Sequence, residues 1–325
     1  MHRPARMISA FASLRCRPRD RAQTFTFARE IYTATALIAL ALCSPTSNAA
    51  DFVIYDFDDT LMRLPTENYA FIRGEHGRVP QPRLFPIISS ELPLLRDEIG
   101  RAGTPLERFE IVGDDRDPVR GSFQNARPGL NGENPFDRDL ARALTLPQAE
   151  RESPLYREWI ARESTETLRP FTRILTGRGN AAHEMHAAFH RLEALHPGFR
   201  APPATRIIPV GGRGKTADRK AEEMQPLLRE AARLGATRII FADDDIRNLE
   251  KSLDVLLSRQ FPTPSARRLI LVREHDTVTF DFRVSDDRED LLRRLREAAA
   301  RPADAAALAR QHQLKASALC RALFF

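Results

Sequence analysis

Strands alternate with helices along the second half of the chain, and this alternation limits the possible folds. Apolar runs typical of strands lie at 171–175, 206–210, 237–242 and 269–272. Helical segments are expected between them, over about 181–195, from the GGRGKTADRK segment to about 234, and over about 246–257. Strands joined by helices of this length form a parallel sheet with helices on both faces. We therefore expect an α/β fold.

Two more strands are expected outside this series. The run FVIYDF at 52–57 is apolar throughout and rich in strand formers. Residues 278–284 alternate between apolar and polar side chains, which predicts a half-exposed strand that is antiparallel to the one before it. Ser285 could cap a final helix, and Pro302 should separate that helix from an Ala-rich helical tail. One face of the final helix would carry Leu291, Leu292 and Leu295.

The segment 62–169 differs from this regular pattern. It has scattered Pro and Gly, many Arg and little periodicity apart from a run at 108–112 and a possible helix over 155–162. We expect it to be an insertion in a core domain that comprises residues 51–61 and 170–325.

The N-terminal residues 1–50 have the pattern of a secretory signal peptide. A basic head precedes 31–43, a stretch of 13 residues without charge, and small residues then lead to a cleavage point after Ala49 or Ala50. The apolar stretch is short for a membrane span, so no stable anchor is expected after cleavage. The predicted location is periplasmic or secreted. The alternative is a misassigned start followed by an ordinary helix.

The basic charge of the chain is concentrated in the same region. The whole chain carries a net charge of +6, of which residues 1–49 contribute +5. The remainder is close to neutral, so a nucleic-acid partner is not expected. Removal of the segment leaves Cys320 as the single thiol, which excludes an intramolecular disulfide or a cysteine metal cluster.

Polar side chains follow the carboxyl ends of several predicted strands. They are Asp56, Asp58, Thr176, the segment 211–220, Asp243 and Asp244. In an open parallel sheet, ligands bind in the crevice at this edge. Of two carboxylates at i and i+2, one could attack phosphorus while the other protonates the leaving oxygen. A cation shared with the acids at 243–245 would offset the negative charge, and all-oxygen ligation suits Mg²⁺.

Four segments carry a resemblance to a known family. DFDDT at 56–60, ILTGR at 174–178, KTADRK at 215–220 and FADDDIRN at 241–248 resemble, in order, the four motifs of the haloacid dehalogenase (HAD) superfamily. The resemblance covers about 51–60 and 170–260. It implies a HAD-like Rossmannoid sheet in which the insertion after the first motif is a cap.

The resemblance also implies roles for individual residues. Asp56 would be the nucleophile that forms an aspartyl-phosphate, and Asp58 would be the general acid and base. Phosphate would be bound by Thr176, Gly177 and Lys220. Mg²⁺ would be held by Asp56, Asp243, Asp244 and the backbone carbonyl of Asp58. The implied activity is Mg²⁺-dependent hydrolysis of a small phosphomonoester, since the dehalogenase branch lacks the second acid of the first motif.

Lys215 and Lys220 both compete for the phosphate-binding role. If Thr216 caps the helix, Lys220 shares one face with Met224, Leu227 and Ala231 at helical spacing. This spacing favours Lys220, because it would lie on the buried side near the crevice.

Simpler interpretations and a rival remain open. The acids at 243–245 could merely cap the next helix. GGRGKT at 211–216 imitates the phosphate cradle of a P-loop nucleotide-binding protein, although the template requires Gly where Pro209 stands. A non-catalytic binding protein on a HAD scaffold is a third possibility.

Overall fold

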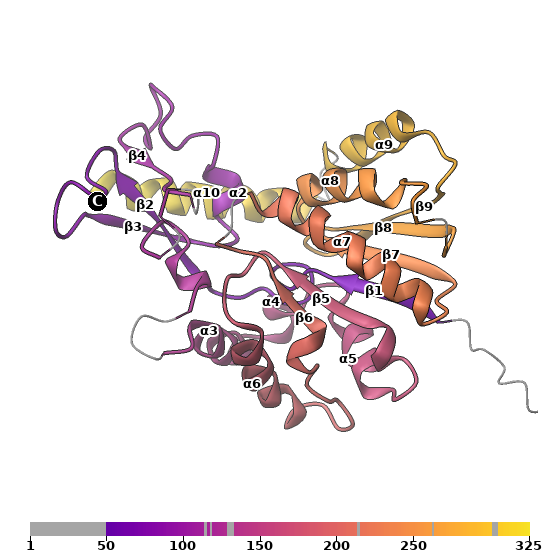
Figure 1. Ribbon diagram of the computed structural model, residues 1–325. Helices are drawn as coiled ribbons and strands as arrows, with labels where there is room; N and C mark the ends of the chain where they lie inside the picture. Colours follow the sequence, from indigo (N-terminus) through magenta and orange to yellow (C-terminus); the bar gives the residue numbers. More distant parts are fainter. Residues whose placement is uncertain are drawn as a thin grey trace, which may run out of the picture. The chain divides into compact units, whose positions relative to one another are not determined.

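The computed structural model describes residues 50–113, 116–117, 119–128, 133–212, 215–261, 263–300 and 305–325. Within these residues, the main element is a six-stranded sheet with the order β6-β5-β1-β7-β8-β9 (Figure 1). Its strands are β1 (Asp51–Tyr55), β5 (Thr172–Thr176), β6 (Ile207–Pro209), β7 (Arg238–Asp243), β8 (Ala266–Val272) and β9 (Thr277–Arg283). All neighbouring pairs are parallel except β8 and β9. The expected α/β fold with an antiparallel last strand is confirmed.

Successive residues of the central strand β1 pack on opposite faces of this sheet. Val53 and Tyr55 belong to one apolar cluster, whereas Phe52 and Ile54 belong to another. The first cluster includes side chains of α3 (Pro135–Leu144), α5 (Tyr156–Ser164) and α6 (Ala182–Glu193). The second includes side chains of α7 (Thr216–Arg233), α8 (Ile246–Leu256) and α9 (Arg288–Ala300). Helices therefore cover both faces, which explains why β1 is apolar throughout.

Two predicted helix caps are wrong. Lys215 is the N-cap of α7 and Thr216 is already helical, although the predicted buried face of the helix is correct. Helix α9 begins at Arg288, and the carboxylate of Asp287 accepts a hydrogen bond of 2.8 Å from the backbone N–H of Asp290. Asp287 rather than Ser285 is therefore the cap. Its carboxylate also interacts favourably with the positive end of the helix dipole.

The segment 62–169 contains elements that its sequence did not reveal. A three-stranded antiparallel sheet has the order β3-β2-β4 among the described residues. Its elements are β2 (Glu67–Ile72), β3 (Leu84–Ile88) and β4 (Phe109–Glu110), with the short helix α2 (Leu92–Leu95). It has an apolar cluster of its own that includes Phe85 and Phe109. After it, α3, α4 (Gln148–Arg151) and α5 follow, and Phe136 and Trp159 join the cluster of the main sheet. The segment thus contributes to both apolar cores.

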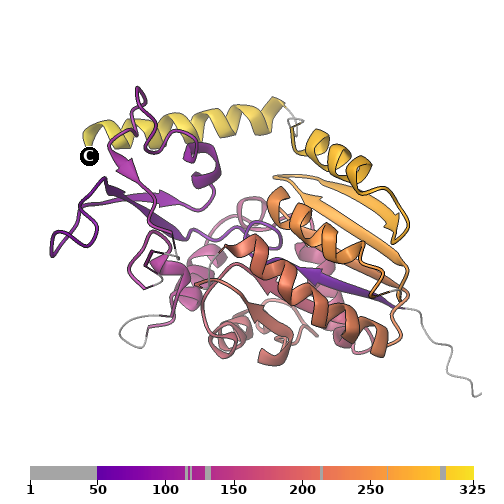
Figure 2. The ribbon, with the colours of Figure 1, turned by 45° about the horizontal axis from the view of Figure 1, so that its top comes forward.

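The C-terminal helix α10 (Ala305–Phe324) confirms the expected helical tail but packs away from the main sheet's clusters. Figure 2 shows it alongside the small sheet. Ala318 and Ala322 join the small sheet's apolar cluster. Arg321 donates hydrogen bonds of 2.8 and 2.7 Å to the buried carboxylate of Glu91. The predicted break at Pro302 lies outside the described residues.

The predicted N-terminal signal peptide also falls outside the described residues, apart from Ala50. Among the helices that the structure does describe, none combines the length and the apolar character that a membrane span requires.

Candidate active site

The sheet topology brings three of the predicted site residues together. Strand β1 lies between β5 and β7. The strands that follow it along the chain therefore extend the sheet first on one side of β1, with β5 and β6, and then on the other side, with β7. Asp56 directly follows β1, Thr176 ends β5 and Asp243 ends β7. The backbone N–H of Asp56 donates to the carbonyl oxygen of Ala242 at 2.9 Å, which keeps the ends of β1 and β7 adjacent. The predicted site thus lies at a topological switch point, where α/β sheets commonly bind ligands.

Lys220 connects two of the carboxylates. Its Nζ lies 2.8 Å from Asp56 Oδ1 and 2.7 Å from Asp243 Oδ2. Although burial lowers the pKa of Lys220, the charges of Asp243 and Asp56 raise this pKa above its ordinary value. Lys215 is exposed at the start of α7. Of the two candidate lysines, Lys220 is therefore the one that contacts the carboxylates, as the helical spacing favoured.

Asp244 joins Asp56 and Asp243 in an acidic cluster. One carboxylate oxygen from each of the three residues lies within 4.8 Å of the others. Burial raises the pKa of Asp56 to about 7, against the lowering effect of Lys220. Burial, followed by the charge of Asp243, raises the pKa of Asp244 well above its ordinary value. Three carboxylates beside one ammonium group leave an excess of negative charge, and their oxygens fit a hard divalent cation.

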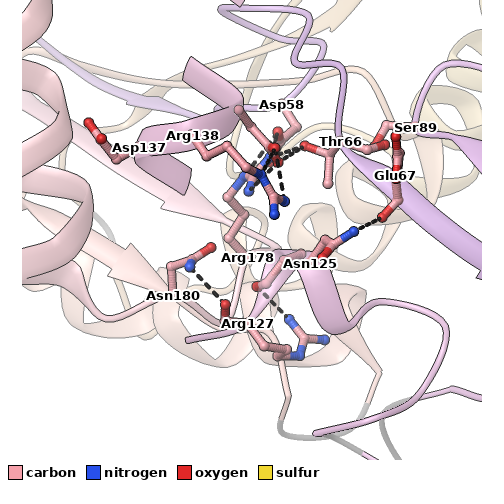
Figure 3. A network of polar contacts seen from close by, with 12 residues as sticks. Asp58, Thr66, Glu67, Ser89, Asn125, Arg127, Asp137, Arg138, Arg178 and Asn180 are labelled. Carbon is pink, nitrogen blue, oxygen red and sulfur yellow. Dashed lines mark hydrogen bonds and ion pairs between the residues drawn. The ribbon is translucent and has the colours of Figure 1, made fainter. Parts of the chain in front are cut away.

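The side chain of Asp58 lies outside this cluster, in contact with Arg178 (Figure 3). Arg178 Nε donates to Asp58 Oδ2 at 2.8 Å, and Nη2 donates to Oδ1 at the same distance. The Asp58 side chain is 27% exposed, compared with 8% for Asp56. The two carboxylates of the first motif therefore have different basic partners, and Asp58 is the more accessible of the two.

Thr176 and Gly177, predicted to bind phosphate, lie where β5 meets the start of α7. The Thr176 hydroxyl is buried and accepts a hydrogen bond of 3.2 Å from the backbone N–H of Arg178. Gly177 is close to Thr216, since a Cβ added to it would lie 3.0 Å from the Thr216 methyl carbon. A side chain at position 177 would therefore crowd the contact between the two segments.

Two side chains that support the acids received no role from the sequence. Asn248 Nδ2 donates to both carboxylate oxygens of Asp243, at 2.9 and 3.1 Å. The hydroxyl of Thr60 donates to Asp244 Oδ1 at 3.0 Å. Both residues belong to the quoted motifs, and Asn248 lies in the first turn of α8, directly after the strand that carries the acids. Their positions within these motifs were the signal by which the sequence could have identified both residues.

Asp245, the third acid of the DDD run, has a structural role. It is the N-cap of α8, and its carboxylate accepts a hydrogen bond of 2.9 Å from the backbone N–H of Arg247. The capping interpretation of the run therefore applies to Asp245, whereas Asp243 and Asp244 belong to the acidic cluster.

The turn after β1 requires an unusual backbone conformation. Asp59 has φ of 59°, in the left-handed region that residues other than glycine seldom adopt. Its N–H donates to the Met62 carbonyl at 2.8 Å. Burial, with the charge of Asp58, raises the pKa of Asp59 to about 7. No role was predicted for Asp59 from the sequence, and the residue lies in the turn that follows β1.

Comparisons with known proteins add no relative to this description. Family models, curated proteins and solved structures were all searched, and none of the three searches found a match to the chain.

Proposed function

We propose that the protein is a Mg²⁺-dependent phosphomonoester hydrolase of the HAD type, acting through an aspartyl-phosphate on Asp56. The observation that carries the proposal is the cluster of Asp56, Asp243 and Asp244, in which one buried lysine contacts Asp56 and Asp243. A second carboxylate, Asp58, lies two residues from the proposed nucleophile and has a separate partner. The order of the four motifs along the chain gives the proposal additional support.

Hydrolysis would proceed in two steps. First, a carboxylate oxygen of Asp56 attacks phosphorus, the ester P–O bond breaks, and the leaving oxygen takes a proton from Asp58. Second, the Asp58 carboxylate takes a proton from water as the water oxygen attacks phosphorus. The bond between phosphorus and Asp56 then breaks, which releases inorganic phosphate and restores the Asp56 carboxylate.

The surrounding residues would hold these groups in place. Lys220 favours the charged form of Asp56, and with Asn248 it orients the Asp243 carboxylate. The Thr176 hydroxyl and the Gly177 N–H would donate to phosphoryl oxygens. Mg²⁺ would be held by the side chains of Asp56, Asp243 and Asp244 and by the backbone carbonyl of Asp58. When bound, it would offset the negative charge of the carboxylates and of the phosphoryl group.

The proposed substrate is a small phosphorylated molecule. The small sheet in segment 62–169 follows the first motif, at the position in the chain where the HAD resemblance implies a cap. With the signal-peptide pattern of residues 1–50, we propose that the enzyme acts in the periplasm or outside the cell.

The test is turnover of p-nitrophenyl phosphate by the purified protein, with Mg²⁺ and with a chelator. Turnover should require Mg²⁺ and should be lost in Asp56→Asn. The matched control is Asp51→Asn, because Asp51 lies at the other end of β1 and pairs with Arg238 at 2.6 Å. Turnover that persists in Asp56→Asn would place the chemistry elsewhere. Tight ATP binding without Asp56-dependent hydrolysis would instead favour the P-loop or binding-protein alternatives.

A further inference from the structure

Arg178 is a buried arginine that contacts Asp58 of the proposed site. It follows β5 by two residues and is 2% exposed. Its Nε and Nη2 make three hydrogen bonds with the Asp58 carboxylate, at 3.1, 2.8 and 2.8 Å. Two nitrogens of the guanidinium thus face two oxygens of the carboxylate, which fixes the plane of the carboxylate as well as its position.

Residues of the segment 62–169 hold Arg178 in turn (Figure 3). Nη2 donates to Thr66 Oγ1 at 2.5 Å, and the Thr66 hydroxyl donates to Asp139 Oδ2 at 2.7 Å. Asp139 is fully buried and lies 3.9 Å from Arg178 Nη1. The centre of the Phe136 ring lies 5.0 Å from the guanidinium carbon. These contacts constrain Arg178 on several sides and hold its guanidinium group in the orientation that contacts Asp58.

This arrangement is more than stability alone requires. Burying a guanidinium group carries a large desolvation cost, and an apolar replacement of similar volume is often as stable. A general acid, by contrast, gains from a fixed orientation, because proton transfer requires hydrogen-bond contact with the reacting oxygen. The short Asp58 side chain has only limited packing of its own, since 27% of it is exposed.

We propose that Arg178 is a positioning residue that holds the Asp58 carboxylate in the orientation for proton transfer, with Thr66 and Asp139 holding Arg178. The inference rests on the proposed function, in which Asp58 is the general acid and base. It makes the insertion part of the catalytic machinery, because the side chains that fix Arg178 come from the residue before β2 and from α3.

The distinguishing measurement is the dependence of the rate on the leaving group. Arg178→Lys keeps the positive charge but cannot make the two-pronged contact. If Asp58 loses its orientation, a poor leaving group that needs the proton suffers more than a good one. We expect kcat/KM for phenyl phosphate to fall by on the order of 100-fold, within the range of general acid catalysis. For p-nitrophenyl phosphate, kcat/KM should fall about tenfold or less.

A matched control and a supporting variant accompany this measurement. Arg173 lies on β5, five residues before Arg178, is 6% exposed and forms a paired contact with Glu230, with Nε 3.0 Å from Oε2. Arg173→Lys should change kcat/KM for the two substrates equally. Thr66→Val removes the hydroxyl that joins Arg178 to Asp139, and should reproduce the Arg178→Lys pattern to a smaller extent. Equal losses on both substrates in Arg178→Lys would overturn the proposal.

A structural readout separates this proposal from the proposed function. In the crystal structure of Arg178→Lys, the Asp58 carboxylate should be rotated or displaced while Asp56 and Asp243 keep their positions. An unchanged Asp58 would overturn the positioning role, whether or not the protein turns over phosphate esters. Absence of Asp56-dependent turnover in the wild type would refute the proposed function, and the Asp58 orientation in this variant would still decide whether Arg178 positions it.

Discussion

The ammonium group of Lys220 lies 2.8 Å from a carboxylate oxygen of Asp56, and both side chains are almost fully buried. Lys220 is on helix α7, whereas Asp56 follows strand β1. Because the same nitrogen also contacts Asp243, one cation balances two carboxylates from neighbouring strands. This contact therefore links the charge balance of the site to the packing of α7 on the sheet.

Replacing Lys220 should destabilise the protein strongly. Lys220→Met would leave Asp56 and Asp243 buried without their cation, and breaking a buried pair costs about 3–5 kcal/mol. The free energy of unfolding in urea, measured at pH 8 in chelator, should fall by about this amount. Lys215→Met changes an exposed residue, so its effect should stay within about 0.5 kcal/mol. Equal stability of the two variants would contradict the role of Lys220.

Neutralising Asp244 should stabilise the metal-free protein. Because the pKa of Asp244 is raised in the folded state, this residue lowers the stability of the fold progressively as the pH rises above its ordinary pKa of 3.8. In chelator at pH 8, Asp244→Asn should gain about 0.5–2 kcal/mol. Added Mg²⁺ should stabilise the wild type by binding the folded state, and should stabilise the variant less. Thermal unfolding with and without Mg²⁺ measures both effects. An equal stabilisation of the wild type and the variant by Mg²⁺ would show that Asp244 is not a metal ligand.

Glu163 should contribute a distinct pH dependence to stability. Burial raises the pKa of this glutamate to about 7, although Arg206 opposes the effect through hydrogen bonds of 3.0 Å. The group's stabilising contribution is full below its ordinary pKa of 4.5 and is lost as the pH rises through about 7. The wild type should lose up to about 1.4 kcal/mol per pH unit in this window.

The comparison of Glu163→Gln with the wild type isolates this contribution. The variant cannot titrate at this position, so its unfolding free energy should change less between pH 4.5 and 7. Glu166→Gln, at an exposed position in the turn after α5, should keep the wild-type slope. Parallel pH profiles for Glu163→Gln and the wild type would show that Glu163 ionises normally.

Gly211 should tolerate no side chain. A Cβ there would lie 2.2 Å from the Gly177 carbonyl oxygen and 2.4 Å from Arg127 Nη1. Because one of these neighbours is backbone, Gly211→Ala must displace the loop that begins at Gly177, one of the predicted phosphate-binding residues. We expect a loss of about 1–3 kcal/mol in stability and reduced turnover. Gly177→Ala would meet only the side chain of Thr216, with the methyl carbon at 3.0 Å, and should cost less. The reverse order of stability would contradict these contacts.

Helix α10 should detach when a charge is placed on its buried face. Ala318 is fully buried in the small sheet's cluster, whereas Ala316 is exposed on the same helix. Ala318→Glu would bury an unpaired carboxylate, which is costly, so the helix should leave the small sheet. Limited proteolysis should then cleave α10 faster than in the wild type. Ala316→Glu should be cleaved at the wild-type rate, and equal rates for both variants would show that α10 does not depend on this contact.

Local sequence patterns were sufficient to predict the main sheet and the position of the acids. The β1, β5 and β7 strands are buried almost throughout, and each contains a short apolar run that is followed by polar residues. The face of α7 that carries Lys220 follows directly from helical spacing. These features depend on neighbours in the chain, which is why periodicity reveals them.

The small sheet and the partner of Asp58 depended on distant residues. Strands β2 and β3 alternate only weakly and bury their apolar side chains partly against α10, more than 200 residues further along the chain. Arg178 meets Asp58 across 120 residues, and Thr66 and Asp139 are brought to it by two further elements. The sequence by itself therefore determined which residues end the strands. Only the tertiary structure decided which charges meet, because ion pairing depends on distances in space that local periodicity does not encode.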